Sequence, residues 1–273
     1  MPPSLAVPAR RVLPLVLMLI GTSAAQAQRR AEDWELSCSQ IRGDRRGEHT
    51  CEIIERTIAA GSALTVDSRV NGGINVIGER RRDVLVRARV EAHARTQRRA
   101  EELAEGVRVS VEPGRISADG PDTRNNEWWV VSFEVHVPAG SNLDLRAHNG
   151  GIGVIGVTGT LRMDTQNGGI HLEAVGGDVV AETMNGGLHI ELTGDRWEGK
   201  GLDATTLNGG VQMRIPQGYS ARLETGTVNG GIDIDFPVMV RGRIGQRITT
   251  ELGSGGATIR ATTTNGGVRI RRE

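Results

Sequence analysis

The stretch RMDTQNGGIHLEAVGGDVVAETMNGGLHIEL, residues 162–192, contains nearly the same phrase twice, eighteen residues apart. Asn-Gly-Gly stands at the same point of each phrase, beginning at Asn167 and Asn185, and alternating residues flank it on both sides. Alternation with period two is typical of a β-strand with one buried face. The stretch therefore predicts two short strands in each repeat, joined by a turn at Asn-Gly-Gly.

The Asn-Gly-Gly motif recurs along the chain. It begins at Asn71, Asn149, Asn167, Asn185, Asn208, Asn229 and Asn265. The central spacings are 18, 18, 23 and 21 residues, and the last gap of 36 residues contains a degenerate GSGGATI at 253–259. Small or apolar residues stand two, four and six places before each asparagine from Asn149 onward. A fixed period near 20 residues indicates a repeat architecture.

An all-β fold, a β-solenoid of two-strand coils of about 18–23 residues, explains this pattern. Equivalent residues of stacked coils lie about 4.8 Å apart, so asparagine side chains can hydrogen-bond along the stack. The glycine after each asparagine leaves room for the next coil, and both residues tolerate the positive φ of a sharp turn. An antiparallel meander or sandwich is the alternative, because Asn-Gly is also a hairpin signal. The predicted ladder comprises Asn149, Asn167, Asn185, Asn208, Asn229 and Asn265.

The chain divides into three predicted parts. Residues 1–27 resemble a signal peptide, with an arginine pair, a short apolar run and a small-x-small cleavage site, Ala25-Gln26-Ala27. Residues 28–140 read as an N-terminal β-rich cap with one short helix at TQRRAEELAEGV, and residues 141–273 form the repeat solenoid. The charged end of the chain, RIRRE, is expected on the last edge strand, where charge opposes end-to-end association. We therefore expect an exported protein that does not span the membrane after cleavage.

The cap contains three further strand-like segments and the cysteines. The segments are DVLVRARVEAHA, VRVSVEPGRISADG and EWWVVSFEVHVPAG, each read as one strand. Cys38 and Cys51 are the two cysteines of the sequence. In an exported protein such a pair is expected to form a disulfide, which would restrain the polar loop between them.

Stacking of the coils predicts one cluster of metal-ligand type. It sets His171 beside His189 and Glu173 beside Glu191 on neighbouring coils. Two imidazoles and two carboxylates can hold a divalent metal ion. The alternative is a solvated polar face on which Arg214, one coil further on, compensates Glu191.

The tryptophans are candidate ligand contacts. Trp197 lies in TGDRWEGKG, the insertion that lengthens one repeat to 23 residues, and an insertion is expected to project from the stack. An exposed indole can stack on a sugar. Trp128 and Trp129 are adjacent in a predicted strand, so one side chain is expected in the core and the other outside.

No convincing catalytic constellation stands out. The acidic residues on the outer face of the first strands alternate with arginines, as expected for a solvated sheet face; they are Asp144, Asp164, Glu182, Asp203 and Glu224. A calcium-binding β-roll needs Asp after the glycines, where this chain has Ile, Leu or Val. We therefore expect a protein without enzymatic activity or cofactor, with a glycan-active enzyme on a β-helix as the alternative.

The stretch VPAGSNLDLRAHNGGIGVIGVTGTLRMDTQNGGIHLEAVGGDVVAETMNGGLHIEL resembles a bacterial family of domains of unknown function named "putative adhesins". The resemblance covers roughly residues 60–273. It implies an extracytoplasmic β-solenoid-like fold and brings no catalytic residues. Many relatives have Asn-Gly-Asp where this chain has Asn-Gly-Gly, so any role of that Asp is absent here.

The expected function is therefore binding or scaffolding at the cell envelope, with a periplasmic or extracellular location. The partner would be an envelope glycan or protein. Nucleic acid is not expected, because 33 basic residues balance 33 acidic residues. A periplasmic sensory or structural module that acts through a partner protein is the remaining alternative.

Overall fold

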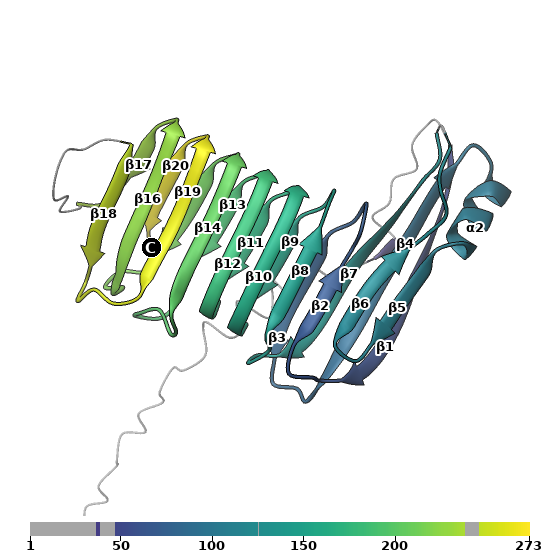
Figure 1. The fold of residues 1–273 in the computed structure, drawn as a ribbon, viewed down its shortest axis with the longest axis horizontal. Helices are drawn as coiled ribbons and strands as arrows, with labels where there is room; N and C mark the ends of the chain where they lie inside the picture. The colour runs from purple at the N-terminus through teal and green to yellow at the C-terminus, as the bar shows by residue number, and fades with distance from the viewer. Residues whose placement is uncertain (1–36, 39–46, 125, 238–245) are drawn as a thin grey trace, which may run out of the picture.

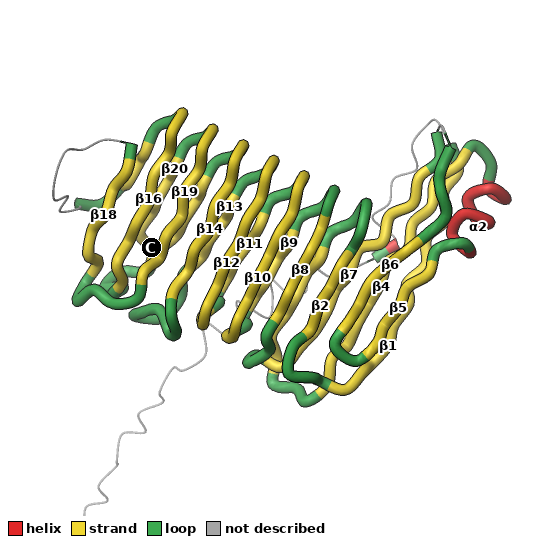
Figure 2. The backbone as a smooth tube through the Cα atoms, in the orientation of Figure 1, coloured by secondary structure: helices red, strands yellow, loops and turns green. Residues whose placement is uncertain are grey.

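The computed structural model describes residues 37–38, 47–124, 126–237 and 246–273. Two ten-stranded sheets face each other along an elongated stack, and α2 (Gln97–Glu105) lies at one end (Figures 1 and 2). The strands of the repeats pair in parallel, which confirms the predicted β-solenoid and excludes the meander. The expected signal peptide lies outside the described residues.

The first sheet, called sheet A, consists in spatial order of β1 (Glu48–Ala59), β4 (Asp83–Ala94), β7 (Trp128–Pro138), β3 (Ile74–Glu79), β9 (Ile152–Ile155), β11 (Ile170–Glu173), β13 (Leu188–Glu191), β15 (Val211–Ile215), β20 (Val268–Arg272) and β17 (Ile232–Ile234). The second sheet, called sheet B, consists in spatial order of β18 (Arg247–Leu252), β16 (Ala221–Asn229), β19 (Thr258–Asn265), β14 (Gly201–Asn208), β12 (Gly176–Asn185), β10 (Thr158–Asn167), β8 (Leu143–Ala147), β2 (Leu64–Asp67), β6 (Arg115–Asp119) and β5 (Arg108–Glu112).

Each coil consists of one strand of sheet B, an Asn-Gly-Gly corner and one strand of sheet A. Equivalent residues pair without a shift, so Leu161 lies opposite Val179 and His171 opposite His189. The alternating apolar positions point between the sheets, where Leu161 and Leu172 are fully buried. Because a strand has a period of two, this unshifted register keeps the same column of side chains in the core through every coil.

The last coil of the chain does not lie at the end of the stack. β19 pairs with β14 on one side and with β16 on the other, and β20 likewise lies between β15 and β17. The expectation that RIRRE forms the last edge is therefore wrong. The stretch GSGGATI is a turn that enters β19, with positive φ at Gly253 and Gly255, and β18 runs antiparallel to β16 at the edge of sheet B.

The N-terminal segment extends both sheets. β1, β4 and β7 are antiparallel neighbours that lengthen sheet A, while β5 and β6 form a hairpin at the end of sheet B. The segment VRVSVEPGRISADG was expected to be one strand, but Gly114, with φ of 83°, turns the chain in its middle. β2 and β3 form a coil within residues 28–140, so strand pairing continues across residue 140 in both sheets.

The helix and the disulfide complete this end. Thr96 caps α2 by accepting a hydrogen bond from the Arg99 N–H, and α2 packs against β4 and β1 through Ala100 and Leu103. Cys38 is bonded to Cys51 in β1, which confirms the predicted disulfide. Among the described residues, no helix has the length and apolar character needed to cross a membrane.

Candidate functional site

The corner asparagines form one continuous file of hydrogen bonds. From Asn149 onward, each side-chain Nδ2 donates to the Oδ1 of the asparagine on one neighbouring coil, at distances of 2.7–3.0 Å. The spatial order differs from the chain order, because Asn265 lies between Asn208 and Asn229. Asn71, which was not among the residues of the predicted ladder, accepts from Asn149 and begins the file. All six asparagines predicted for the ladder lie in it.

The first glycine of each corner is required by close packing. A Cβ on Gly168 or Gly186 would overlap the carbonyl oxygen of the corresponding glycine in the neighbouring coil. Neither of these glycines nor Asn185 has a positive φ, so the expected left-handed turn is wrong at these corners. Glycine is therefore needed here because two backbones approach closely, not because of backbone conformation.

Threonines attach neighbouring coils to each other at the same corners. The Thr165 hydroxyl donates to the Gly150 carbonyl at 2.7 Å, and Thr183 donates to Gly168 at 2.7 Å. Thr206 and Thr263 repeat the contact. The hydroxyl satisfies a carbonyl that the strand ladder leaves free, so the corner is rigid.

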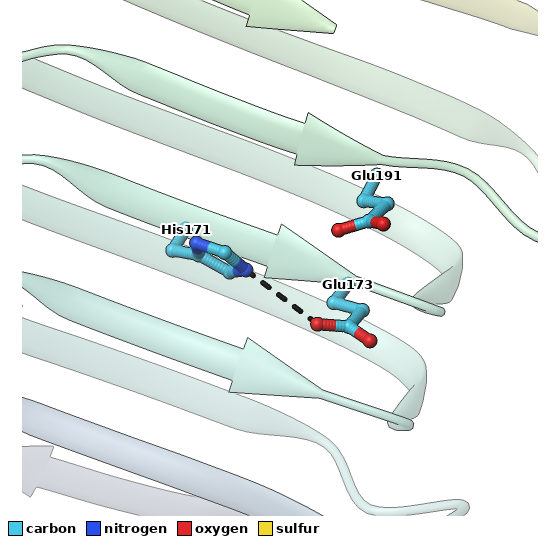
Figure 3. A group of neighbouring side chains, drawn as sticks. All are labelled: His171, Glu173 and Glu191. Atoms are coloured by element: carbon cyan, nitrogen blue, oxygen red, sulfur yellow. Dashed lines mark ion pairs between the residues drawn. The ribbon is translucent and has the colours of Figure 1, made fainter. Parts of the chain in front are cut away.

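The predicted metal cluster is partly assembled. Ligand atoms of His171, Glu173 and Glu191 all lie within 4.8 Å of one another (Figure 3). His171 Nε2 is 3.7 Å from a Glu173 carboxylate oxygen. The ring of His189 stacks on His171 with 4.8 Å between centroids, and His189 is not in the group of three.

Burial distinguishes this cluster from a solvated face. Glu173 and Glu191 are only 7% and 8% exposed, although they occupy outward register positions. Ile155, which lies opposite Glu173 on the neighbouring strand β9, is also buried. The outer face of sheet A is therefore shielded from solvent at this position of β9, β11 and β13. The alternative interpretation, a solvated polar face, therefore does not describe the two glutamates.

His189 and Arg214 are charged or titratable neighbours of the cluster. Burial, and then the neighbouring His189, lower the pKa of His171 from its ordinary value of 6.5. Arg214 Nη1 lies 3.8 Å from a Glu191 carboxylate oxygen, as the sequence suggested, and 3.3 Å from Glu273. A neutral imidazole beside two carboxylates is a donor set suited to a cation.

Trp197 does not project from the stack. Its ring is 6% exposed and belongs to the core, and its indole N–H donates to the Gly177 carbonyl at 3.0 Å. The insertion folds back against Gly177 at the start of β12, because a large ring gains by burial once its N–H has a partner. The prediction that Trp197 is an exposed ligand contact is therefore wrong.

Trp128 is an exposed tryptophan of the cap. It is 40% exposed while Trp129 is buried, which confirms the expected division of this pair. The Trp128 ring stacks on His93 at 4.6 Å, and His93 stacks on His49 at 5.7 Å. Sequence reasoning missed this row of rings, because it depends on the register of three strands that are distant in sequence.

A shallow groove of about 540 Å³, called the corner groove, runs beside the asparagine file on the outside of sheet B. Met184 and Leu207 line it from adjacent coils and are 46% and 44% exposed. Asp164 and Glu182 lie in the same groove. The position before each asparagine faces outward; in the other coils it holds the polar residues His148, Gln166 and Thr264 or the exposed valines Val70 and Val228.

Most of the outer acidic residues of sheet B have arginine partners. Asp144 lies 2.7 Å from Arg146, and Asp203 lies 3.0 Å from Arg260. Arg222 and Arg260 lower the pKa of Glu224 by hydrogen bonding. These ion pairs agree with the interpretation of a charge-balanced sheet face.

A two-sheet β-solenoid of in-register coils with asparagine corners is the class of protein that this fold defines. Residues 72–271 match the model of the family described as Toastrack DUF4097, a domain of unknown function, and the chain belongs to this family. The resemblance inferred from the sequence is thus confirmed. No curated protein matches the chain.

Several solved structures are similar over most of their length. A "putative cell adhesion protein" from Clostridium sporogenes ATCC 15579 is 9% identical with a TM-score of 0.45, covering 83% of this chain and 100% of that chain. A "putative adhesin" from Bacteroides fragilis NCTC 9343 is 10% identical with a TM-score of 0.35, covering 81% and 97%. A "putative lipid binding protein" from Parabacteroides distasonis ATCC 8503 is 10% identical with a TM-score of 0.32, covering 83% and 98%.

Proposed function

We propose that this protein is an exported, non-catalytic module that binds or scaffolds a component of the bacterial cell envelope, in the manner of an adhesin. The observation that carries the proposal is the exposed pair Met184 and Leu207 on adjacent coils of the corner groove. Single exposed apolar side chains are ordinary, but neighbouring ones within a groove are typical of interaction surfaces.

The rigidity of the scaffold supports a binding role. Met184 and Leu207 directly precede Asn185 and Asn208, whose side chains are hydrogen-bonded to each other at 2.9 Å. The backbone beneath the groove is therefore ordered before any partner arrives. Binding then loses little conformational entropy, so a modest apolar contact can contribute to affinity.

Export is supported by the disulfide between Cys38 and Cys51, because disulfides persist in oxidising compartments. Cell fractionation followed by mass spectrometry of the N-terminus tests this part of the proposal. We expect a mature protein that begins at Gln28 in the periplasmic or extracellular fraction. A cytoplasmic protein that retains residues 1–27 would contradict it.

Co-sedimentation with envelope fractions tests the binding surface. Changing both Met184 and Leu207 to Ser should weaken binding by about tenfold or more, because two apolar contacts of roughly 1 kcal/mol each are lost. Ile53→Ser is the matched control, since Ile53 is 40% exposed on β1, far from the groove. Equal binding by the double variant and the wild type would refute the groove, and absence of wild-type binding would refute the proposal.

The same experiment separates the alternatives. Protease treatment of the envelope fraction should abolish binding if the partner is a protein, as a sensory or structural module requires. Periodate treatment should abolish it if the partner is a glycan. Release of new reducing ends or unsaturated sugars from envelope polysaccharide by the wild type would instead favour a glycan-active enzyme.

A further inference from the structure

We propose that His171, Glu173 and Glu191 form a binding site for one divalent transition-metal ion of the zinc type. The ion would join the neighbouring strands β11 and β13 at the outer face of sheet A (Figure 3). This site lies on the sheet opposite the corner groove and does not depend on the proposed envelope role.

The spacing of the three donors is close to that of a zinc site. A tetrahedral zinc ion with bonds of about 2.0–2.1 Å sets its ligand atoms about 3.3 Å apart. His171 Nε2 and the nearer Glu173 oxygen are 3.7 Å apart, and the three ligand atoms lie within 4.8 Å of one another. Side-chain rotations that move atoms by about 1 Å would complete the coordination.

Two buried carboxylates lie side by side at the site. The carboxylates of Glu173 and Glu191 occupy the same register position on adjacent strands, and both residues are less than a tenth exposed. Two buried carboxylates at this separation repel each other and are costly to desolvate. Arg214 contacts Glu191 from the next strand but is shared with Glu273, whereas a divalent ion would balance both carboxylates together.

The fold restricts the donor set to two coils. On one side, the register partners of His171 and Glu173 are Gly153 and Ile155, which have no donor side chain. On the other side, the partners of His189 and Glu191 are Gln212 and Arg214. Among the described residues, the geometry therefore defines one bounded site that would hold one ion.

The chemistry of the donors selects the class of ion. One imidazole nitrogen and two carboxylates suit zinc and similar transition metals. Calcium prefers six to eight oxygen ligands, which this pair of strands does not present. A water molecule, or His189 after a rotation of its ring, would supply the fourth ligand.

Isothermal titration of the tag-free, EDTA-treated full chain with ZnCl₂ at pH 7.5 tests the proposal. We expect one zinc ion per chain, no comparable binding of MgCl₂ or CaCl₂, and visible absorption bands after CoCl₂ is added. Glu173→Gln and Glu191→Gln should each weaken zinc binding on the order of 100-fold. Glu182→Gln, a matched carboxylate change on β12 of the other sheet, should leave it unchanged.

Two further variants keep the test decisive. His171→Gln alters a half-buried side chain and should fold even if a glutamate variant does not, while losing zinc binding to the same extent. Arg214→Gln should bind zinc as tightly or more tightly, because a competing cation is removed. Wild-type protein that binds no zinc, or a folded His171→Gln or Glu191→Gln variant with wild-type affinity, would overturn the proposal.

Discussion

At the scale of single residues, the two glycines of a corner have different roles. The first approaches the backbone of the neighbouring coil so closely that any side chain would overlap it, whereas the second does not. At Gly187 a Cβ would lie 3.3 Å from the Gly210 carbonyl oxygen, a tight but tolerable distance. Local φ alone would not distinguish Gly186 from Gly187, because neither has a positive φ.

This difference predicts the stability of two alanine variants. Gly186→Ala should lower the free energy of unfolding by about 3 kcal/mol or more, because its Cβ overlaps the Gly168 carbonyl and the coils must separate. Gly187→Ala should cost about 1 kcal/mol or less. Urea denaturation of both variants measures the difference. Equal losses of stability would show that close approach does not explain the first glycine.

At the scale of elements, the last strands of the chain are internal to the sheets. Chain termini are usually frayed, but β19 has a parallel partner on each side, whereas β18 and β17 are edge strands. The amides of β19 should therefore exchange with deuterium as slowly as those of β14 and more slowly than those of β18. Hydrogen-exchange mass spectrometry measures this order. Fast exchange in Thr258–Asn265 would contradict the internal position.

The repeats could be predicted from the sequence because each depends on local pattern. Alternation places Leu161 and Met163 in the core, and the common period places asparagine beside asparagine. The order of the last coils could not be predicted, since every coil has the same corner and the motif does not specify which neighbour it meets. The burial of Glu173 could not be predicted either, because the alternating pattern of its strand indicates only that its side chain points outward.

Trp197 shows a second limit of local pattern. An insertion that breaks a repeat looks like a projecting loop, yet the core accepts its ring and the Gly177 carbonyl accepts its N–H. The metal-type cluster was foreseeable as a set of residues, because the unshifted register sets His171 beside His189. The burial of the two glutamates was not foreseeable, because it depends on which residues cover the outer face of sheet A and not on the pattern of the strand itself.

At the scale of the whole molecule, pH should alter stability through a charged network in sheet A. His136 on β7 bonds to Glu134 at 2.9 Å and to Glu79 on β3 at 2.7 Å, and Arg87 on β4 lies 3.3 Å from Glu134. Hydrogen bonding to Glu134, opposed by burial and assisted by Glu79, raises the pKa of His136 above 6.5. The folded state therefore holds this proton more tightly than the unfolded chain.

The stabilisation from His136 should be complete below pH 6.5, the ordinary pKa of the unfolded chain, and should decline as the pH rises through the raised folded value. Urea unfolding from pH 5.5 to 9 should show this decline in the wild type. His136→Gln should be less stable than the wild type at pH 5.5, and the gap between them should narrow with rising pH. A gap that widens with rising pH would contradict the assigned direction.

The central claim is that every Asn-Gly-Gly corner lies in one file, with the C-terminal coil inserted between β15 and β17 in sheet A. Paired cysteines at exposed register positions test it most directly. Gln212 and Arg269 are neighbours on β15 and β20. Gln212 and Asp233 are two strands apart, about 9.6 Å, which is beyond the reach of a disulfide.

Under mild oxidation, Gln212→Cys with Arg269→Cys should form a disulfide within one chain, detected by peptide mapping, while Gln212→Cys with Asp233→Cys should not. The reverse result would show that the coils stack in chain order and would contradict this account.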